Sequence, residues 1–452
     1  MKFKYFYMKW RFTFIVAVSV CLIINVLNAV PVMAQKVINA RDFGAKGDGL
    51  TDDAIAINKA WDKAIKANLP LFIPAGTYIV SSNIIVPALQ ANSEVVLMGE
   101  GKNTILKRKD GSVNANLSIV IFNINNASGN VNITIKDIAF DDNADKQMKP
   151  LHPYDLEHAA TIRFGGKNED FVYNSFKVQN VYFYNPIADH IWVNNLGKQF
   201  LADNVTATGR TRTRSDIDFS MMPQQIRITN SRMNNLESEP VQQVKKKFAC
   251  SFIVQNVTLS QKLDLSGIYN VEPVTVDIQN VTVKGETFLG NLVGTFTDCE
   301  LRGIGRMVRN NLEFRNCKIV LPLKENSDTV MPIQIDYNME RDPAPIYKKN
   351  SFINCSFIID SRKPEIRGTM IESFSAQKTL DVMTVFDGCV FDNRADCNIE
   401  NYRNGKYVIR NCQLGVNPNS PKACVSMPPS AKYRSSTDVS GNKILRGGYK
   451  NF

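Results

Sequence analysis

The stretch Ile278-Gln279-Asn280-Val281-Thr282-Val283 contains the pattern that decides the fold. Apolar residues alternate with other residues around a central Asn or Asp, and this six-residue pattern recurs through most of the chain. The spacing between neighbouring copies runs from 18 residues, between Phe296 and Phe314, to 43 residues, between Ile135 and Val178. Further copies begin at Ile228, Val254, Phe352, Phe386 and Ile409, and a weaker copy contains Asn204-Val205-Thr206.

This alternation predicts strands with one buried face. A single strand of this kind cannot bury its apolar face alone, so the copies are expected to stack as a β-solenoid. About ten stacked strands would form a rod roughly 50 Å long, given a strand spacing of about 4.8 Å. The recurring Asn or Asp predicts a side-chain ladder at the turns, so the Asn-Val-Thr triplets at 204, 256 and 280 are interpreted as repeat units and not as glycosylation sites.

Most cysteines follow the same register. Five of them occupy the position after the central Asn, Asp or Gly, which predicts a stack of small buried side chains. They are Cys299, Cys317, Cys355, Cys389 and Cys412. Cys397 and Cys424 lie outside this position and are candidates for a disulfide in an oxidising compartment. No C-x-x-C pair occurs, so a zinc site is not expected.

The composition describes a folded chain that carries a leader. Its 452 residues are 44% hydrophobic and 21% charged, which excludes collagen-like, disordered and multi-span membrane proteins. Basic residues precede an apolar run over residues 12–27, and Val32-Met33-Ala34 precedes Gln35, which predicts a signal peptide over residues 1–34. A retained anchor over residues 12–34 is the alternative, disfavoured by its asparagines and Pro31. Cleavage would lower the net charge from +11 to +7.

The mature chain is expected to open with a cap. Residues 41–49 are rich in turn formers, and Thr51-Asp52-Asp53 provide a capping residue and first-turn acids for a helix that ends near Ala67. A helix directly before a solenoid is suited to cover its open apolar end. The predicted divisions are the cap and first rungs over residues 35–110, the parallel β-helix over 111–428 and a C-terminal tail over 429–452.

The stretch from Asp42-Phe43-Gly44 to Thr51-Asp52-Asp53, followed by Phe72-Ile73-Pro74-Ala75-Gly76-Thr77-Tyr78, resembles the opening of the pectate-lyase-like superfamily. That superfamily includes rhamnogalacturonases, polygalacturonases, phage tailspike depolymerases and some epimerases. The resemblance implies an all-β, right-handed parallel β-helix and a polysaccharide substrate. It does not fix the reaction, since the motif belongs to the cap. The Asn-Thr-Asp, Gly-His-Gly and Arg-Ile-Lys motifs of polygalacturonases are absent from the sequence.

Aligning the strands after the repeats by their inward apolar residues predicts two columns of outward side chains. One column holds Thr161, His190 and Asp216, and the other holds Arg163, Trp192 and Asp218. Residues two apart on a strand are about 6.5–7 Å apart, which lets two carboxylates reach the roughly 6.5–9.5 Å separation of an inverting glycosidase.

Asp216 and Asp218 are therefore the predicted acid/base pair. Asp189, His190 and Glu239 are expected to assist them. Trp192 is expected to pack against a sugar ring, and basic side chains are expected to hold an acidic sugar. These basic residues are Arg163, His158, Arg210, Arg212 and Arg214.

The sequence thus predicts a secreted or periplasmic enzyme that hydrolyses glycosidic bonds of an acidic polysaccharide, without a metal or cofactor. A polysaccharide lyase or epimerase is the alternative, with bound calcium possible in a lyase. A non-catalytic polysaccharide-binding or surface-structural β-helix is the alternative from another class. Nucleic acid is not an expected partner because the basic residues are scattered, and no stable membrane insertion is expected after cleavage of the signal peptide.

Overall fold

The computed structural model describes residues 36–85, 89, 92–112, 122–123, 131–147, 159–165, 173–194, 197–209, 215–238, 249–266, 274–336, 349–374, 383–401, 406–426 and 438–450. The predicted signal peptide, residues 1–34, lies outside them. Among the described residues, no helix is both long and apolar enough to span a lipid bilayer.

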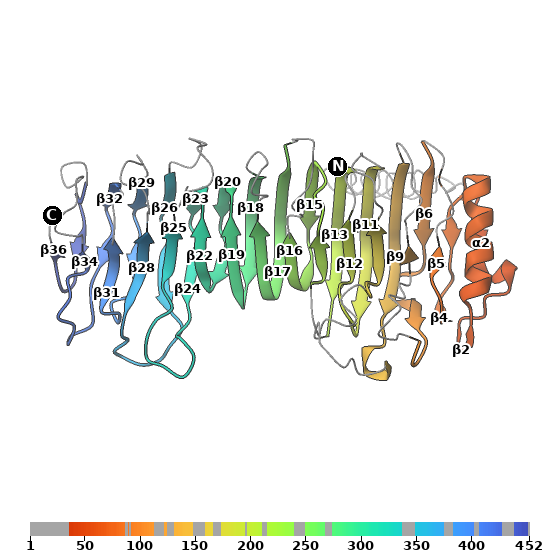
Figure 1. Ribbon diagram of the computed structural model, residues 1–452, viewed down its shortest axis with the longest axis horizontal. Coiled ribbons are helices and arrows are strands. Elements are labelled where there is room, and N and C mark those ends of the chain that lie inside the picture. Colours follow the sequence, from red (N-terminus) through yellow and green to blue (C-terminus); the bar gives the residue numbers. More distant parts are fainter. Residues whose placement is uncertain are drawn as a thin grey trace, which may run out of the picture. The chain divides into compact units, whose positions relative to one another are not determined.

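Residues Ile38–Phe452 form one unit, in which every pairing between the named strands of the described residues is parallel. The strands stack in three ladders, and each turn of the chain visits the three in order (Figure 1). The first ladder consists of β1 (Ile38–Asn39), β3 (Leu71–Phe72), β6 (Glu94–Met98), β9 (Val131–Asp141), β11 (Tyr173–Tyr184), β13 (Gly197–Ala207), β15 (Gln225–Thr229), β17 (Ser251–Ser266), β18 (Val274–Val283), β20 (Leu292–Thr297), β23 (Asn311–Arg315), β26 (Lys349–Ile353), β29 (Met383–Asp387) and β32 (Lys406–Arg410).

The longer strands bend and continue into the next ladders. The second ladder consists of β2 (Asp48–Asp52), β4 (Gly76–Val80), β7 (Thr104–Arg108), the later parts of β9, β11 and β13, the start of β16 (Arg232–Ser238), parts of β17 and β18, β21 (Glu300–Arg302), β24 (Lys318–Leu321), β27 (Ser356–Ile359), β30 (Val390–Phe391), β33 (Gln413–Leu414) and β35 (Lys443–Ile444).

The third ladder carries most of the predicted site. It consists of β5 (Ile84–Ile85), β8 (Phe122–Asn123), β10 (Ile162–Gly165), β12 (Ile191–Asn194), β14 (Ile217–Phe219), the ends of β16 and β17, β19 (Glu286–Gly290), β22 (Ile304–Val308), β25 (Ile333–Asp336), β28 (Thr369–Phe374), β31 (Cys397–Asn401), β34 (Val425–Ser426) and β36 (Tyr449–Lys450).

The fold is therefore an all-β parallel β-helix, as predicted. The first ladder of the described residues contains fourteen strands, more than the expected ten or so. The sequence count missed β1, β3 and β6 because none of these strands belongs to a complete copy of the six-residue pattern. The predicted boundary at residue 428 is also wrong, since β35 and β36 lie in the supposed tail and extend the second and third ladders. Each is only two residues long, too short to show a pattern.

The predicted Asn ladder is present at the turns between the first and second ladders. Asn204, Asn256 and Asn280 have positive φ angles of 52°, 56° and 50°, a conformation that Asn tolerates better than most residues. Their side-chain amides bond from rung to rung: Nδ2 of Asn280 donates to Oδ1 of Asn256 at 2.9 Å, and Nδ2 of Asn256 donates to Oδ1 of Asn230 at 3.0 Å. The Asn-Val-Thr triplets are thus repeat turns.

The interior is filled by stacked inward side chains that belong to one hydrophobic cluster. Phe314 stacks on Phe296 and on Phe352 with ring centroids 4.9 and 4.8 Å apart. The five predicted inward cysteines are buried and carry free thiols. Cys397 and Cys424 are also free, so the candidate disulfide does not form in this structure.

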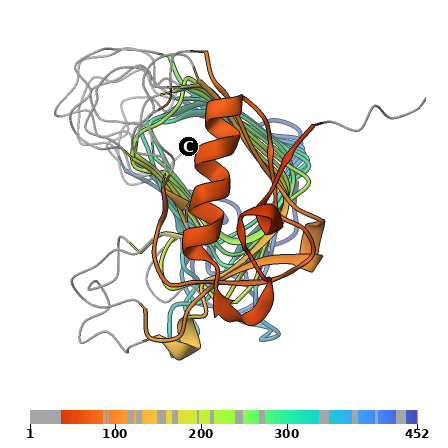
Figure 2. The same cartoon turned by 90° about the vertical axis from the view of Figure 1, so that its right-hand side faces the viewer.

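One α-helix, α2 (Ala54–Ala67), lies at the β2–β5 end of the unit and crosses the end of the coil (Figure 2). Its buried face, which includes Ile57 and Trp61, joins the core cluster. The helix ends where sequence predicted, but Asp53 does not cap it with its side chain. Its carboxylate instead accepts backbone hydrogen bonds from Lys46 at 2.7 Å and Gly47 at 3.1 Å, which holds the preceding turn. Within the described ranges, short 3-10 helices span Ala40–Phe43, Gly101–Asn103 and Ala144–Lys146.

Candidate functional site

A line of polar residues occupies the corner between the second and third ladders. Asp142 follows β9, whereas Thr161, His190 and Asp216 each directly precede a strand of the third ladder, namely β10, β12 and β14. Backbone hydrogen bonds link these positions across rungs, from the Thr161 amide to the Asp189 carbonyl and from the His190 amide to the Ser215 carbonyl. Thr161, His190 and Asp216 therefore stack one per rung at this corner, as the sequence alignment predicted, and Asp142 lies in the same rung as Thr161.

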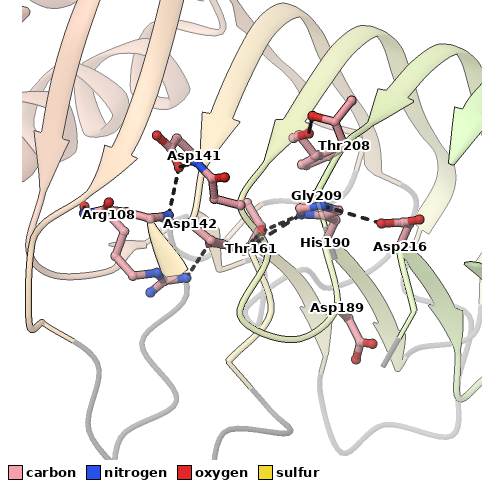
Figure 3. Close-up of polar contacts among 12 residues, drawn as sticks. Arg108, Asp141, Asp142, Thr161, Asp189, His190, Thr208, Gly209 and Asp216 are labelled. Atoms are coloured by element: carbon pink, nitrogen blue, oxygen red, sulfur yellow. Dashed lines mark hydrogen bonds and ion pairs between the residues drawn. The ribbon is translucent and has the colours of Figure 1, made fainter. Parts of the chain in front are cut away.

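The corner begins with a buried ion pair (Figure 3). Arg108 Nη2 lies 2.9 Å from Asp142 Oδ1, and both side chains are fully buried. The Thr161 hydroxyl donates a hydrogen bond to the other carboxylate oxygen of Asp142 and lies 3.2 Å from His190 Nδ1. Because the Thr161 proton is used by Asp142, the Nδ1 atom of His190 is best assigned as the donor to the Thr161 oxygen.

The other end of the corner joins His190 to Asp216. Nε2 of His190 lies 3.5 Å from Oδ1 of Asp216, and the His190 ring stacks on Phe183 with centroids 4.7 Å apart. Oδ2 of Asp216 accepts backbone hydrogen bonds from Asn234 and, at 2.9 Å, from Asn235. Burial lowers the pKa of His190 to about 4, although the nearby Asp216 carboxylate opposes this.

Burial also raises the pKa of Asp216, more than His190 and the two amides lower it. It raises the pKa of Asp142 in the same way, against the effect of Arg108. At neutral pH the corner therefore favours a neutral imidazole. Nε2 of His190 and Oδ1 of Asp216 form no hydrogen bond among the described residues, although they lie 3.5 Å apart.

The predicted exposure of this column is wrong. Thr161, His190 and Asp216 are 0%, 0% and 1% exposed, so in this structure they do not reach a ligand at the surface. Asp189 also differs from the prediction, because its side chain points away from His190 and Asp216 (Figure 3). Its Oδ1 accepts a hydrogen bond from the Ser215 amide at 2.8 Å. The alternation of a strand placed these residues in the right rungs, but they lie at a corner, where alternation no longer gives the direction of a side chain.

A second column runs along the third ladder itself. The strand register aligns Arg163 with Trp192, Trp192 with Asp218, Asp218 with Glu237 and Glu237 with Asp264. The predicted column of Arg163, Trp192 and Asp218 is thus correct in register. It continues into two further carboxylates, one per rung and about 4.8 Å apart. We call Asp218, Glu237 and Asp264 the acidic column.

Trp192 is not the open aromatic surface that the sequence suggested. It is 8% exposed, and the Arg163 guanidinium lies over its ring, 4.6 Å from the centroid. Its Nε1 donates to the Ser220 hydroxyl at 2.7 Å, and that hydroxyl lies 3.5 Å from Asp218 Oδ2. Burial lowers the pKa of Arg163. Trp192 and Ser220 therefore support Asp218 from the side.

Lys262 connects the two carboxylates that are partly accessible. Its Nζ lies 2.9 Å from Glu237 Oε1 and 2.8 Å from Asp264 Oδ2, whose side chains are 15% and 17% exposed. Burial by itself would lower the pKa of Lys262, but the hydrogen bonds to Asp264 and Glu237 outweigh it and raise this pKa. Burial raises the pKa of Asp264 more than Lys262 lowers it. The Ser215 hydroxyl donates to Glu237 Oε2.

Several residues of this arrangement were not among the predicted site residues. Lys262 and Asp264 could have been found, because they alternate with the inward Leu263 and Leu265 after a repeat copy. Arg108 and Asp142 carried no such signal. Among the described residues, no three His, Cys, Asp or Glu side chains are grouped closely enough to hold a metal ion. Five predicted residues lie outside the described residues: Glu239, His158, Arg210, Arg212 and Arg214.

The protein is a parallel β-helix, in which three parallel ladders wind around one apolar core. A row of carboxylates lies along the third ladder. The chain belongs to the family described as rhamnogalacturonase A/epimerase, pectate lyase-like, whose model matches residues 37–269. This match covers the site described above, from Arg108 to Asp264.

The proteins that this chain resembles in sequence include a phage appendage protein and a polysaccharide lyase. The preneck appendage protein of Bacillus phage PZA is 37% identical over 119 residues, which are 26% of this chain and 13% of the phage protein. Alginate lyase 7 of Azotobacter vinelandii is 44% identical over 77 residues, 16% of this chain and 9% of the lyase. The chain therefore matches only a small part of the length of these relatives.

Among solved structures, the catalytic unit of a GH87 α-1,3-glucanase from Streptomyces thermodiastaticus strain HF3-3 has a TM-score of 0.45 and 13% identity. That alignment covers 91% of this chain and 69% of the glucanase chain.

Proposed function

We propose that this protein is an exported enzyme that hydrolyses glycosidic bonds in a polysaccharide, and that the acidic column is its active site. The observation that carries the proposal is the register of Asp218, Glu237 and Asp264 on three successive rungs, with Lys262 between the last two. The relative named as an alginate lyase supports a carbohydrate substrate. The order of basic, apolar and small residues in segment 1–34 supports export.

In this proposal Asp264 and Glu237 divide the acid and base roles. The raised pKa of Asp264 favours its protonated form, so it donates a proton to the glycosidic oxygen. Glu237 accepts hydrogen bonds from Lys262 and Ser215, which stabilise its ionised form as the nucleophile or base. A one-rung spacing of about 4.8 Å is close to the roughly 5–5.5 Å between the carboxyl groups of retaining glycosidases.

The remaining predicted residues have supporting roles. Asp218 lies beside Glu237 on the preceding rung, but its side chain is fully buried and not outward as predicted, so it supports the column from within. Asp216 and His190 act as positioning residues, because both are buried behind the column. Hydrolysis is favoured over elimination, since the described basic groups nearest the column are poor bases: Lys262 is held protonated and the pKa of buried His190 is about 4.

The test is a screen of the purified mature chain against neutral and uronate-containing polysaccharides, with new reducing ends and unsaturated products measured together. Glu237→Gln and Asp264→Asn should each lower kcat at least about 100-fold, the usual effect of losing a general acid or base. The matched control is Asp277→Asn, which changes a partly exposed carboxylate that pairs in the first ladder. Full activity of both column variants would refute the assignment. Unsaturated products would establish elimination, and binding without any cleavage would establish the non-catalytic alternative.

A further inference from the structure

A polar groove of about 300 Å³ lies beside the turns between the first and second ladders. It is formed by β16, β17, β18 and the turns that precede their second-ladder segments. The residues that line it include Asn230, Arg232, Asn256, Thr258, Asn280 and Thr282, and none of these belongs to the acidic column. The volume is at the lower end of the range of about 300–1,000 Å³ typical of small-ligand sites.

The floor of the groove is a single column of outward side chains. The register aligns Arg232 with Thr258 and Thr258 with Thr282, so these groups repeat at about 4.8 Å along the stack. Arg232 is exposed and the two threonines are half-buried. Within the described part of the chain, no hydrogen bond or ion pair engages the Arg232 guanidinium or either threonine hydroxyl. One cation and two hydroxyl groups therefore face the groove without a protein partner there.

The Asn ladder adds amide groups along the edge of the groove. The Asn256 amide donates one N–H to Asn230 on the preceding rung. Its oxygen accepts one hydrogen bond from Asn280 on the next rung. An amide has two N–H donors and two acceptor lone pairs, so Asn256 retains one of each. The groove thus combines a planar cation with donors and acceptors at regular spacing, whereas it has no aromatic ring.

We propose that this groove binds a carboxylate-bearing sugar unit of an acidic polysaccharide at a second site, away from the acidic column. The carboxylate forms a paired, charge-assisted contact with Arg232, and the sugar hydroxyl groups bond to Thr258, Thr282 and the free positions of Asn256. Arg232 opens β16 and Glu237 lies five residues later, about 16 Å along the strand. The groove therefore holds the polymer at a distance from the carboxylates of the column, which would repel an acidic sugar.

The test is calorimetric titration of the mature chain with galacturonate oligosaccharides and with their methyl-esterified counterparts. All proteins carry Glu237→Gln, so that cleavage does not consume the ligand. Arg232→Gln should weaken one binding event at least about tenfold, as expected for loss of a charge-assisted contact, and Thr282→Val should weaken it less. The matched control is Arg227→Gln, which removes an exposed arginine of β15 outside the groove.

Each outcome is decisive for the groove, whether or not the protein is an enzyme. Weaker binding in Arg232→Gln but not in Arg227→Gln, and only for the free acid, supports the site. Equal losses of affinity in Arg232→Gln and Arg227→Gln would mean that only the net charge of the protein matters, and would overturn the proposal. Unchanged binding in Arg232→Gln, or equal binding of the esterified oligosaccharides, would also overturn it. A failure of the proposed hydrolysis would appear in a separate activity measurement. The protein that retains Glu237 would then release no new reducing ends from the polysaccharide.

Discussion

The buried imidazole of His190 should make the corner between the second and third ladders sensitive to acid. Burial lowers its pKa to about 4 in the folded chain, whereas an unfolded histidine has a pKa near 6.5. As the pH falls, the unfolded state binds the proton first, so His190 contributes stability above about pH 6.5 and loses it as the pH falls towards 4. The difference of about 2.5 pKa units corresponds to about 3 kcal/mol, most of which is lost by pH 4.5.

The raised pKa values of Asp142 and Asp216 act in the opposite direction, since their folded forms hold protons more tightly than the unfolded chain does. The comparison is therefore between the protein and its His190→Gln variant, whose amide keeps a donor near Thr161. Hydrogen exchange of the β12 and β14 amides, corrected for the intrinsic rate at each pH, measures local opening in a solenoid that need not unfold in two states. Between pH 7.5 and 4.5 the protein should lose about 2–3 kcal/mol more protection than the variant, while β29 and β32 serve as controls. Equal losses in both proteins would refute the buried, neutral state of His190.

Two further predictions concern the scaffold. Asn256→Gly should destabilise its rung by about 1 kcal/mol, because it removes the ladder bonds to Asn230 and Asn280, whereas glycine tolerates the φ of 56°. Asn256→Ala should cost about 1–2 kcal/mol more, since alanine is strained at this φ. Local hydrogen exchange measures both, and equal effects would contradict the role of the φ angle. If α2 closes the apolar end of the coil, Ile57→Ala, at a fully buried position, should cost about 2–5 kcal/mol in urea unfolding, and Ile55→Ala, at a position 70% exposed, should cost little. Similar costs for the two would contradict that packing.

The strands, their register and the Asn ladder could be predicted because each depends on local alternation that repeats. An inward Phe or Ile in one copy aligns with the inward residue of the next, and this fixes which outward residues share a column, as it did for Trp192 and Asp218. Lys262 and Asp264 follow the same rule within β17. Extending the alignment by two rungs, through Glu237, would have included them.

The corner could not be predicted in the same way. The Arg108–Asp142 pair joins residues 34 apart, and neither belongs to a copy of the six-residue pattern. At a corner the chain turns from one ladder to the next, so a side chain that alternation places outside is covered by its neighbours. This is why the rung of His190 was correct and its exposure was not. Repeats carry information on register, whereas burial at a corner depends on contacts between side chains that do not repeat.

The corner also bears on the acidic column through the backbone. Asp216 lies two residues before Asp218 in the chain, and its Oδ2 accepts hydrogen bonds from Asn234 and Asn235, which precede Glu237 in β16. One carboxylate oxygen thereby links the residue before β14 to the middle of β16, alongside the backbone register that places Asp218 beside Glu237. Loss of Asp216 would release that register without removing any group from the column. In the proposed site Asp216 is therefore a positioning residue, whereas the sequence singled it out as one of the reacting pair.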